Sequence, residues 1–173
     1  MIELQAFEEA DFKRFISWIQ SEEELVQFAG PAFNYPITAE QLSTYICDKR
    51  RKPYKICNVE SGEIIGHCEL NFQNPVPRLS RILIADPSYR NKGIGQKVVR
   101  IMLDIIFSST SYNFVDLSVF DWNENAITCY QRIGFKITPD SETQMQVGSQ
   151  TWKAFSMVLS REEYLHHAAA IPY

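Results

Sequence analysis

Long hydrophobic runs are missing from this sequence. No apolar stretch approaches the roughly 18 residues that a membrane-spanning helix needs. The first residues, Met-Ile-Glu-Leu-Gln, lack the basic region and the apolar segment of a secretory signal. These absences argue against an integral membrane protein and against a secreted one, so we expect a cytoplasmic protein with no membrane partner.

Paired cysteines are also absent. Cys47, Cys57, Cys68 and Cys129 lie far apart, and no two of them form a C-x-x-C motif. This spacing is typical of free thiols in a protein core rather than of disulfides or a zinc site. His67 stands beside Cys68 without further ligands at metal-binding spacing, so we predict no metal.

An excess of basic residues is the third absence. The chain has 17 Lys and Arg residues against 21 Asp and Glu residues, with a formal net charge of -4. The two signs are interspersed, so no basic stripe is available for a nucleic-acid duplex. We therefore expect no nucleic-acid partner.

What the sequence does contain is enough apolar material for a sizeable core. Of its 173 residues, 45% are hydrophobic and 13% are aromatic, which excludes a disordered or fibrous chain. No repeat, low-complexity tract or linker divides it. Length and composition together predict a single domain over residues 1–173.

Hydrophobic periodicity predicts strands and helices arranged around one sheet. Alternating apolar residues indicate strands, and apolar residues three or four positions apart indicate helices. We expect strands over residues 2–6, 54–59, 64–72, 81–85, 114–120 and 151–159, and helices over residues 12–19, 98–106 and 125–133. Ser61-Gly62 marks a hairpin turn, and residues 138–150 are expected to form a loop.

Two further helices are expected after capping motifs. Ser21 with Glu24, and Thr38 with Gln41, fit the capping box, in which a hydroxyl and a residue three positions later satisfy N–H groups at a helix start. A Gly-Pro pair at residues 30–31 separates these helices. The resulting order of elements predicts a mixed α plus β class.

The corner between the strand at 81–85 and the next helix predicts an anion site. Residues 90–95 read Arg-Asn-Lys-Gly-Ile-Gly. A helix start leaves N–H groups unpaired and presents the positive end of the helix dipole. Gly93 and Gly95 remove Cβ atoms that would hold a phosphate away, and Arg90 and Lys92 add mobile positive charge. The alternative is that Gly93 only eases a turn and the cations are solvated.

Two motifs in this chain resemble the GCN5-related N-acetyltransferase family. The R-x-x-G-x-G motif of residues 90–95 is similar to that family's coenzyme A pyrophosphate loop, whereas G-x-x-x-x-G-K-[ST] is absent. A second segment is similar to N-x-x-A-x-x-x-Y-x-x-x-G-F and runs from Asn123 through Ala126 and Tyr130 to Gly134 and Phe135. The flanking elements also resemble the ribosomal-protein N-terminal acetyltransferase-like branch.

The resemblance implies a fold and a cosubstrate. The family fold is a central, mostly antiparallel, twisted sheet of about six to seven strands, splayed between its fourth and fifth strands and flanked by helices. The cosubstrate would be acetyl-CoA, with its pantetheine arm in the splay. The residues that would hold it are Ile82, Leu83, Ile84, Arg90, Asn91, Lys92, Gly93, Ile94, Gly95, Gln96, Asn123, Asn125 and Tyr130. Asn125 also fits a cap for the helix that follows, and capping alone would explain Asn123 too.

The resemblance also implies catalytic roles. Tyr130 matches the general acid that protonates the departing thiolate, and the backbone N–H near Leu83 would polarise the thioester carbonyl. Ser118 stands where some relatives carry a strand glutamate. Glu69 is the candidate base, with a solvated edge position as an equal alternative, and Asp121 is a second candidate that a turn would also explain.

The acceptor is only loosely constrained. A primary amine is implied: a protein N-terminus, a polyamine, an aminoglycoside or another small amine. Glu22, Glu23 and Glu24 could attract a cationic amine, but acidic residues in a first helical turn also favour the helix dipole. The tail over residues 164–173 is expected to fray or to pack on a second subunit of a homodimer. A non-catalytic sensor or interaction module that binds coenzyme A is the alternative function.

Overall fold

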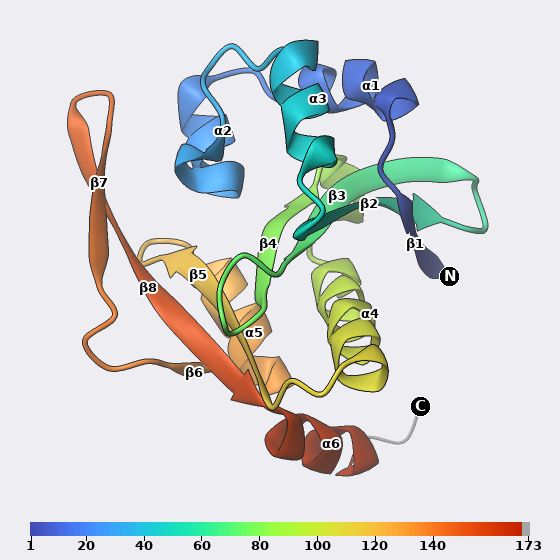
Figure 1. The fold of residues 1–173 in the computed structure, drawn as a ribbon, viewed down its shortest axis with the longest axis vertical. Coiled ribbons are helices and arrows are strands. Elements are labelled where there is room, and N and C mark those ends of the chain that lie inside the picture. The colour runs from blue at the N-terminus through green and yellow to red at the C-terminus, as the bar shows by residue number, and fades with distance from the viewer. Residues whose placement is uncertain (171–173) are drawn as a thin grey trace.

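Eight strands form one sheet in the computed structural model, which describes residues 1–170 and the side chains of residues 1–166 (Figure 1). The strands are β1 (Ile2–Ala6), β2 (Arg51–Asn58), β3 (Glu63–Asn71), β4 (Arg78–Ile84), β5 (Phe114–Phe120), β6 (Lys136–Ile137), β7 (Thr143–Val147) and β8 (Gln150–Ser160). The helices are α1 (Phe12–Trp18), α2 (Glu22–Ala29), α3 (Ala39–Cys47), α4 (Ile94–Ser109), α5 (Glu124–Ile133) and α6 (Arg161–Ala170).

The sheet is antiparallel except at one junction. Its order is β1-β2-β3-β4-β5-β8-β6, with β7 pairing to β8, and only β4 and β5 are parallel. This arrangement confirms the predicted mixed, mostly antiparallel fold with a splay between the fourth and fifth strands. The sheet has eight strands rather than six or seven because two segments after α5 also pair with β8.

Two apolar cores lie on opposite faces of the sheet. Helices α4 and α5 pack on one face, with Val98, Met102 and Ile133 fully buried among strand residues. Helices α1, α2 and α3 cover the other face, where Phe15 and Leu42 are fully buried. Figure 1 shows these three helices above the sheet and α4 and α5 below it. The central strands are therefore buried on both faces.

The helix starts follow the predicted caps. The Ser21 hydroxyl accepts a hydrogen bond from the Glu24 N–H at 3.1 Å, and the Thr38 hydroxyl accepts one from the Gln41 N–H at 3.3 Å. The Glu24 carboxylate accepts from the N–H of Gln20, one residue before the cap. Both predicted N-caps are confirmed, and each fixes where its helix begins.

The segment over residues 138–150 is not a loop, as the sequence suggested. Residues 143–147 form β7, which pairs with β8 from Thr143 opposite Ala154 to Val147 opposite Gln150. The resulting hairpin extends as an arm on the left of Figure 1. Its polar, mostly exposed residues obscured the alternation in the sequence.

The structure describes the backbone of the C-terminal tail as far as residue 170. Residues 161–170 form α6, and Tyr164 is buried against Phe107 with its hydroxyl donating to Asp104 at 2.8 Å. This part of the tail therefore packs on its own chain. Residues 171–173 lie outside the described part.

The splay begins immediately after a short paired segment. Only Arg78 opposite Asp116 and Leu79 opposite Leu117 connect β4 to β5. The Arg78 guanidinium donates to both oxygens of the Asp116 carboxylate, at 2.8 and 2.7 Å. This bidentate pair holds the narrow end of the splay together, and the rest of β4, up to Ile84, has no strand partner on that side.

A bulge in β4 lies at the start of the splay. His67 pairs with Leu83 and Glu69 with Ser80, so Cys68 stands opposite both Arg81 and Ile82. Arg81 has a φ of 51°, in the left-handed region that most side chains avoid. The extra residue bends β4 and turns the Arg81 side chain toward the helices α2 and α3.

Gly66 permits the close approach of β3 and β4 beside this bulge. A Cβ at Gly66 would lie 2.1 Å from the Leu83 carbonyl oxygen. We expect Gly66→Ala to destabilise the fold by about 3 kcal/mol, a melting-temperature loss of roughly 6–12 °C, because backbone must move. Gly95→Ala is the matched control, since a Cβ there would meet only the Cys129 sulfur at an ordinary 3.8 Å. Equal melting temperatures for the two variants would contradict the packing argument.

Candidate active site

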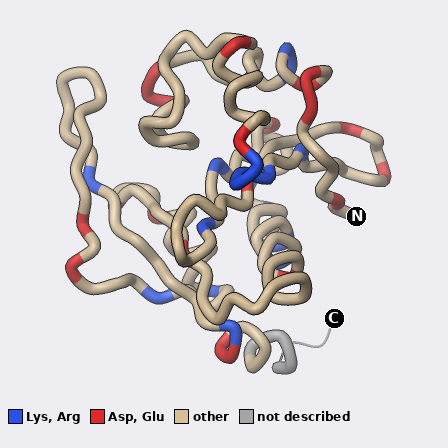
Figure 2. The backbone as a smooth tube through the Cα atoms, in the orientation of Figure 1, with Lys and Arg blue, Asp and Glu red and all other residues tan. Residues whose placement is uncertain are grey.

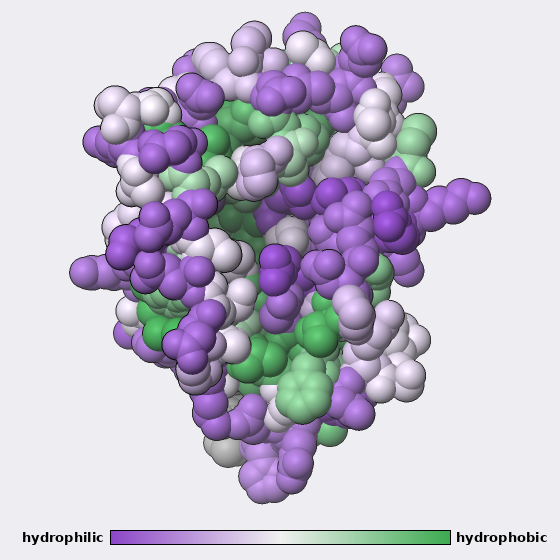
Figure 3. Space-filling view, turned by 60° about the vertical axis from the view of Figure 1, so that its left-hand side comes forward, coloured by the Kyte–Doolittle hydropathy of each residue, from purple (hydrophilic) through white to green (hydrophobic). Residues whose placement is uncertain are grey.

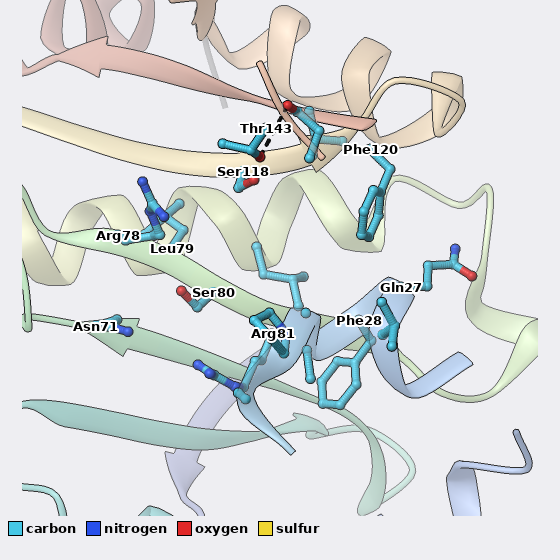
Figure 4. A pocket seen from close by; sticks show the side chains of 18 of the residues that line it. Gln27, Phe28, Asn71, Arg78, Leu79, Ser80, Arg81, Ser118, Phe120 and Thr143 are labelled. Carbon is cyan, nitrogen blue, oxygen red and sulfur yellow. Dashed lines mark hydrogen bonds between the residues drawn. The ribbon is translucent and has the colours of Figure 1, made fainter. Parts of the chain in front are cut away.

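A cleft of about 490 Å³ opens where β4 and β5 diverge. Its walls come from β4 and β5, its roof from residues 26–32 in and after α2, and its far side from residues 143–145 of β7 and from α5. In Figure 3 a recessed hydrophobic area lies between hydrophilic flanks on this side of the molecule. Figure 4 shows Ser80 of β4 and Ser118 of β5 facing the gap from its two sides.

Tyr130 of α5 lines this cleft. Its ring packs at an angle against Phe135, with 6.0 Å between the ring centroids. The Tyr130 hydroxyl makes no hydrogen bond to any residue with a described side chain. Burial, with a smaller contribution from Cys129, raises the pKa of the Tyr130 phenol. The phenol is therefore protonated at neutral pH and available as a hydrogen-bond and proton donor.

Asn123, not Asn125, caps the helix that carries Tyr130. The Asn123 side-chain oxygen accepts from the Ala126 N–H at 3.3 Å, and Asn125 is exposed in the first turn of α5. The capping role predicted for Asn125 is thus wrong, because the helix begins one residue earlier than expected. Asn123 also lines the cleft. At its other end α5 stops at Gly134, which takes a φ of 115°.

The loop at residues 90–96 forms an exposed cradle at the start of α4. Gly93 is the N-cap, with a φ of 73°, and no heavy atom lies within 4 Å of where its Cβ would be. The N–H of Lys97 donates to the Gly93 carbonyl oxygen at 3.1 Å, and this is the first hydrogen bond of the α4 helix. The N–H groups of Ile94, Gly95 and Gln96 therefore have no helical acceptor and point out of the helix end.

Arg90 is tied to the backbone rather than mobile. Its guanidinium donates to the carbonyl oxygens of Ile84 at 3.1 Å and Ala85 at 3.3 Å. The expected mobile charge is therefore wrong for Arg90, although Lys92 is exposed. The two bonds fix the cradle to the end of β4, so the loop and the free edge of that strand keep a constant relative position.

The cradle and the cleft are separate openings that share two elements. None of residues 90–96 lines the cleft. Strand β4 leads from the cleft at Ile82 through Leu83 and Ile84 to the loop, and α4 contacts α5, where Gly95 lies beside Cys129, the neighbour of Tyr130. A long ligand following the unpaired edge of β4 would thus extend from the cradle to the Tyr130 phenol.

Glu69 is neither a solvated edge residue nor open to the cleft as a free carboxylate. It is fully buried on β3. One of its oxygens accepts from Arg51 at 3.0 Å, and the other accepts from Arg81 and from the Tyr45 hydroxyl, both at 2.5 Å. The geometry makes Glu69 the anion shared by two guanidinium groups, which leaves it poorly suited to take a proton from an acceptor.

His67 belongs to the same buried cluster. Burial lowers its pKa to about 3, so the ring is neutral, and its Nδ1 lies 3.1 Å from the Arg81 carbonyl oxygen. His67 and Glu69 thus hold the backbone and the side chain of the bulged residue. The signal for this cluster was their two-residue spacing, which puts both side chains on one face of a strand.

The remaining candidates lie away from the cleft. Asp121 is exposed in the turn after β5 and does not line the cleft, and the three carboxylates at residues 22–24 occupy the first turn of α2. That position fits the helix-dipole explanation. Within the described residues no group of three His, Cys, Asp or Glu side chains is placed to hold a metal ion. Nor is any described helix both long and apolar enough to cross a membrane.

Comparisons with known proteins agree with this geometry. A family model described as "Acetyltransferase (GNAT) family" matches residues 10–135. The chain is 24% identical over 157 residues to an N-acetyltransferase 9-like protein of Nematostella vectensis, covering 83% of this chain and 79% of that protein. It is 28% identical over 105 residues to the spermidine N(1)-acetyltransferase of Escherichia coli (strain K12), covering 60% of this chain and 56% of that protein.

A solved structure has the same fold. The spermidine N-acetyltransferase from Vibrio cholerae in complex with CoA and spermine superposes with a TM-score of 0.79 at 19% identity. The superposition covers 95% of this chain and 98% of that one. The two chains therefore share their fold. The finer resemblance to the ribosomal-protein branch stays a prediction.

Proposed function

The chain belongs to the acetyltransferase (GNAT) family and is an acetyl-CoA-dependent N-acetyltransferase, and we propose that it acetylates a small amine by direct attack in a ternary complex. The observation that carries this mechanism is the unbonded Tyr130 hydroxyl in the cleft between the diverging strands. That phenol is a proton donor at the place where strand pairing stops.

The residues present fit the cosubstrate. A diphosphate matches the cradle, because Gly93 leaves open space and the first N–H groups of α4 are free of helical acceptors. We propose that residues 91–96 hold the diphosphate and that the free edge of Ile82, Leu83 and Ile84 bonds the pantetheine arm. The bulge at Arg81 bends β4 where this edge begins. Arg90 supports the cradle from the end of β4, and Asn123 contributes from the cap of α5.

The chemistry divides between solvent and one side chain. When bound, acetyl-CoA supplies the acetyl group as a thioester, so a C–N bond to the acceptor forms as the C–S bond breaks. The Tyr130 hydroxyl gives its proton to the departing sulfur, the attacking nitrogen loses a proton to water, and the Tyr130 phenolate regains one from that water. Since Leu83 and Ala85 face β3, the N–H of a residue next to Leu83, on the free edge of β4, stabilises the charge on the carbonyl oxygen.

The acceptor must lose a proton before it attacks. No Asp or Glu is among the described residues that line the cleft, and Glu69 is committed to two arginines. We therefore propose that an ordered water, rather than a carboxylate, takes the ammonium proton. Ser80 and Ser118, which line the two walls of the cleft, are the side chains that we propose bind this water.

Release of free thiol from acetyl-CoA in the presence of amines tests the proposed function. A panel of amino acids, phosphorylated amines, polyamines, aminoglycosides and N-terminal peptides should contain an acceptor that accelerates thiol release at least tenfold over hydrolysis. Calorimetric titration with coenzyme A should show binding by the same protein. Binding without turnover of any amine would contradict the proposal and favour the coenzyme-binding sensor.

A further inference from the structure

We propose that the acceptor is an amine that also carries an oxyanion group, a carboxylate or a phosphate, and that the free edge of the Arg81 guanidinium binds this group. The inference rests on the proposed function and specifies its substrate class. It follows from the charges of the cleft, from the state of each arginine in it and from the surroundings of Arg81.

The charged side chains that line the cleft all have one sign. They are Arg51, Arg78 and Arg81, and no carboxylate is among the described lining residues. Figure 2 shows several Lys and Arg segments near the centre of the view, with acidic segments beside them. Each arginine is ion-paired to a carboxylate outside this lining, so the cleft offers an anion unbonded N–H donors rather than a large excess of positive charge.

The three arginines differ in which of their N–H donors remain without an acceptor. Arg78 spends its bidentate edge on Asp116. Arg51 donates to Glu69 and lies 3.7 Å from Asp48. Arg81 donates to Glu69 through Nη1 alone, and its Nε is buried without any hydrogen-bond partner. Arg81 therefore retains the edge formed by Nε and Nη2.

That edge has the geometry that recognises an oxyanion. Nε–H and the neighbouring Nη2–H point in parallel and can donate to two oxygens of one carboxylate or phosphate. A buried donor left without a partner is costly, and only a small fraction of buried groups in folded proteins are left so. Glu69 is shared between Arg81 and Arg51, and Arg51 also pairs with Asp48, so what the pairing leaves unsatisfied is the Arg81 Nε donor.

The surroundings strengthen this interaction. The Arg81 side chain is 7% exposed, and its guanidinium lies over the rings of Phe33 at 5.6 Å and Tyr45 at 5.4 Å. These rings exclude water from one side of the charge, which increases its attraction for an anion. The bulge, with the Arg81 carbonyl near His67 and Nη1 bonded to Glu69, fixes the direction of the side chain.

Matched pairs of acceptors test the proposal. Phenylalanine against phenethylamine varies a carboxylate, and phosphoethanolamine against ethanolamine varies a phosphate, with spermidine as the polycation. We expect at least a tenfold higher kcat/KM for the acid-bearing member of one pair, and the responding pair identifies the group. In the presence of coenzyme A the same member should raise the melting temperature, a readout that needs no turnover.

Arg81→Lys identifies the residue responsible. Lysine keeps the charge but loses the two-donor edge, so the preference within the responding pair should fall about tenfold while coenzyme A affinity is unchanged. If Arg81→Lys does not fold, Arg51→Lys replaces it, and the preference within the responding pair should then fall by less than tenfold. Lys153→Gln is the control for general charge, because Lys153 does not line the cleft although its neighbours Trp152 and Ala154 do; its preference should equal the wild type.

The outcomes distinguish a failure of the oxyanion inference from a failure of the proposed acetyltransferase function. Faster turnover of spermidine or of the neutral members would overturn the oxyanion inference and leave the acetyltransferase assignment intact. An Arg81→Lys preference equal to the wild type would overturn the role of Arg81. Coenzyme A binding without turnover, but with stabilisation by acid-bearing amines, would contradict the proposed function while supporting the anion site.

Discussion

Tyr130→Phe is expected to lower kcat by at least 100-fold while leaving coenzyme A affinity within twofold of the wild type. The substitution removes only the hydroxyl, which makes no hydrogen bond within the described part of the chain, so the fold has no bond to lose. Loss of a positioned general acid typically costs a factor of 100 to 10,000. Stopped assays of thiol release and calorimetric titration with coenzyme A measure the two quantities.

Tyr54→Phe is the control for this substitution. Tyr54 is also half-buried, burial also raises the pKa of its phenol, and it lies on β2, where it does not line the cleft. Its variant should keep wild-type kcat. Equal activity of Tyr130→Phe and Tyr54→Phe would remove Tyr130 from the mechanism and leave water as the proton source.

The pH profile gives an independent readout of the same phenol. A tyrosine acid works only when protonated, and burial raises the Tyr130 pKa above its ordinary value of 10.0. Raising the pKa extends the protonated range upward, so kcat with saturating acceptor should not fall between about pH 8 and pH 10. A decline with a midpoint near or below 10 would show an unshifted acid. The Tyr130→Phe profile should lack any limb that belongs to this group.

Elements with strong local signals were predictable from the sequence. Strand β5 has the expected bounds at Phe114–Phe120, and α4 follows the corner where its apolar stripe begins. Such elements combine a clear hydrophobic period with a cap or turn, so local and tertiary preferences agree. Strand β7 has neither signal. It is extended because it pairs with β8. Its existence depends on a partner strand that local sequence does not reveal.

The site shows the same division in sharper form. The cradle and the helix of Tyr130 have sequence motifs, because glycines and a cap are needed at fixed spacing. The bulge has none, since an arginine at a φ of 51° is held there by tertiary contacts, among them those with Glu69 and His67. The burial of Glu69 was not predicted. Strand alternation shows which residues share a face of the sheet, but not that α1–α3 cover that face.

Gly93→Val is expected to weaken coenzyme A binding by about 100-fold. A valine side chain would occupy the open space in front of the N–H groups of α4, where the diphosphate is proposed to lie. Each lost charge-assisted hydrogen bond is worth about 1.5–3 kcal/mol, so displacing one or two donors accounts for this factor. Titration calorimetry gives the dissociation constant, and turnover at saturating coenzyme should fall less than affinity.

The strain of the substitution must be separated from its effect on the ligand. Valine at a φ of 73° is disfavoured wherever it stands, but Gly62, in the β2–β3 turn, has a φ of 72° and equally open surroundings. Gly62→Val should therefore lower the melting temperature about as much as Gly93→Val and leave coenzyme A affinity unchanged. Should both variants bind coenzyme A like the wild type, the cradle is only a turn. If only Gly93→Val loses affinity for coenzyme A, backbone strain cannot be the cause, and the valine must block the N–H groups at the start of α4.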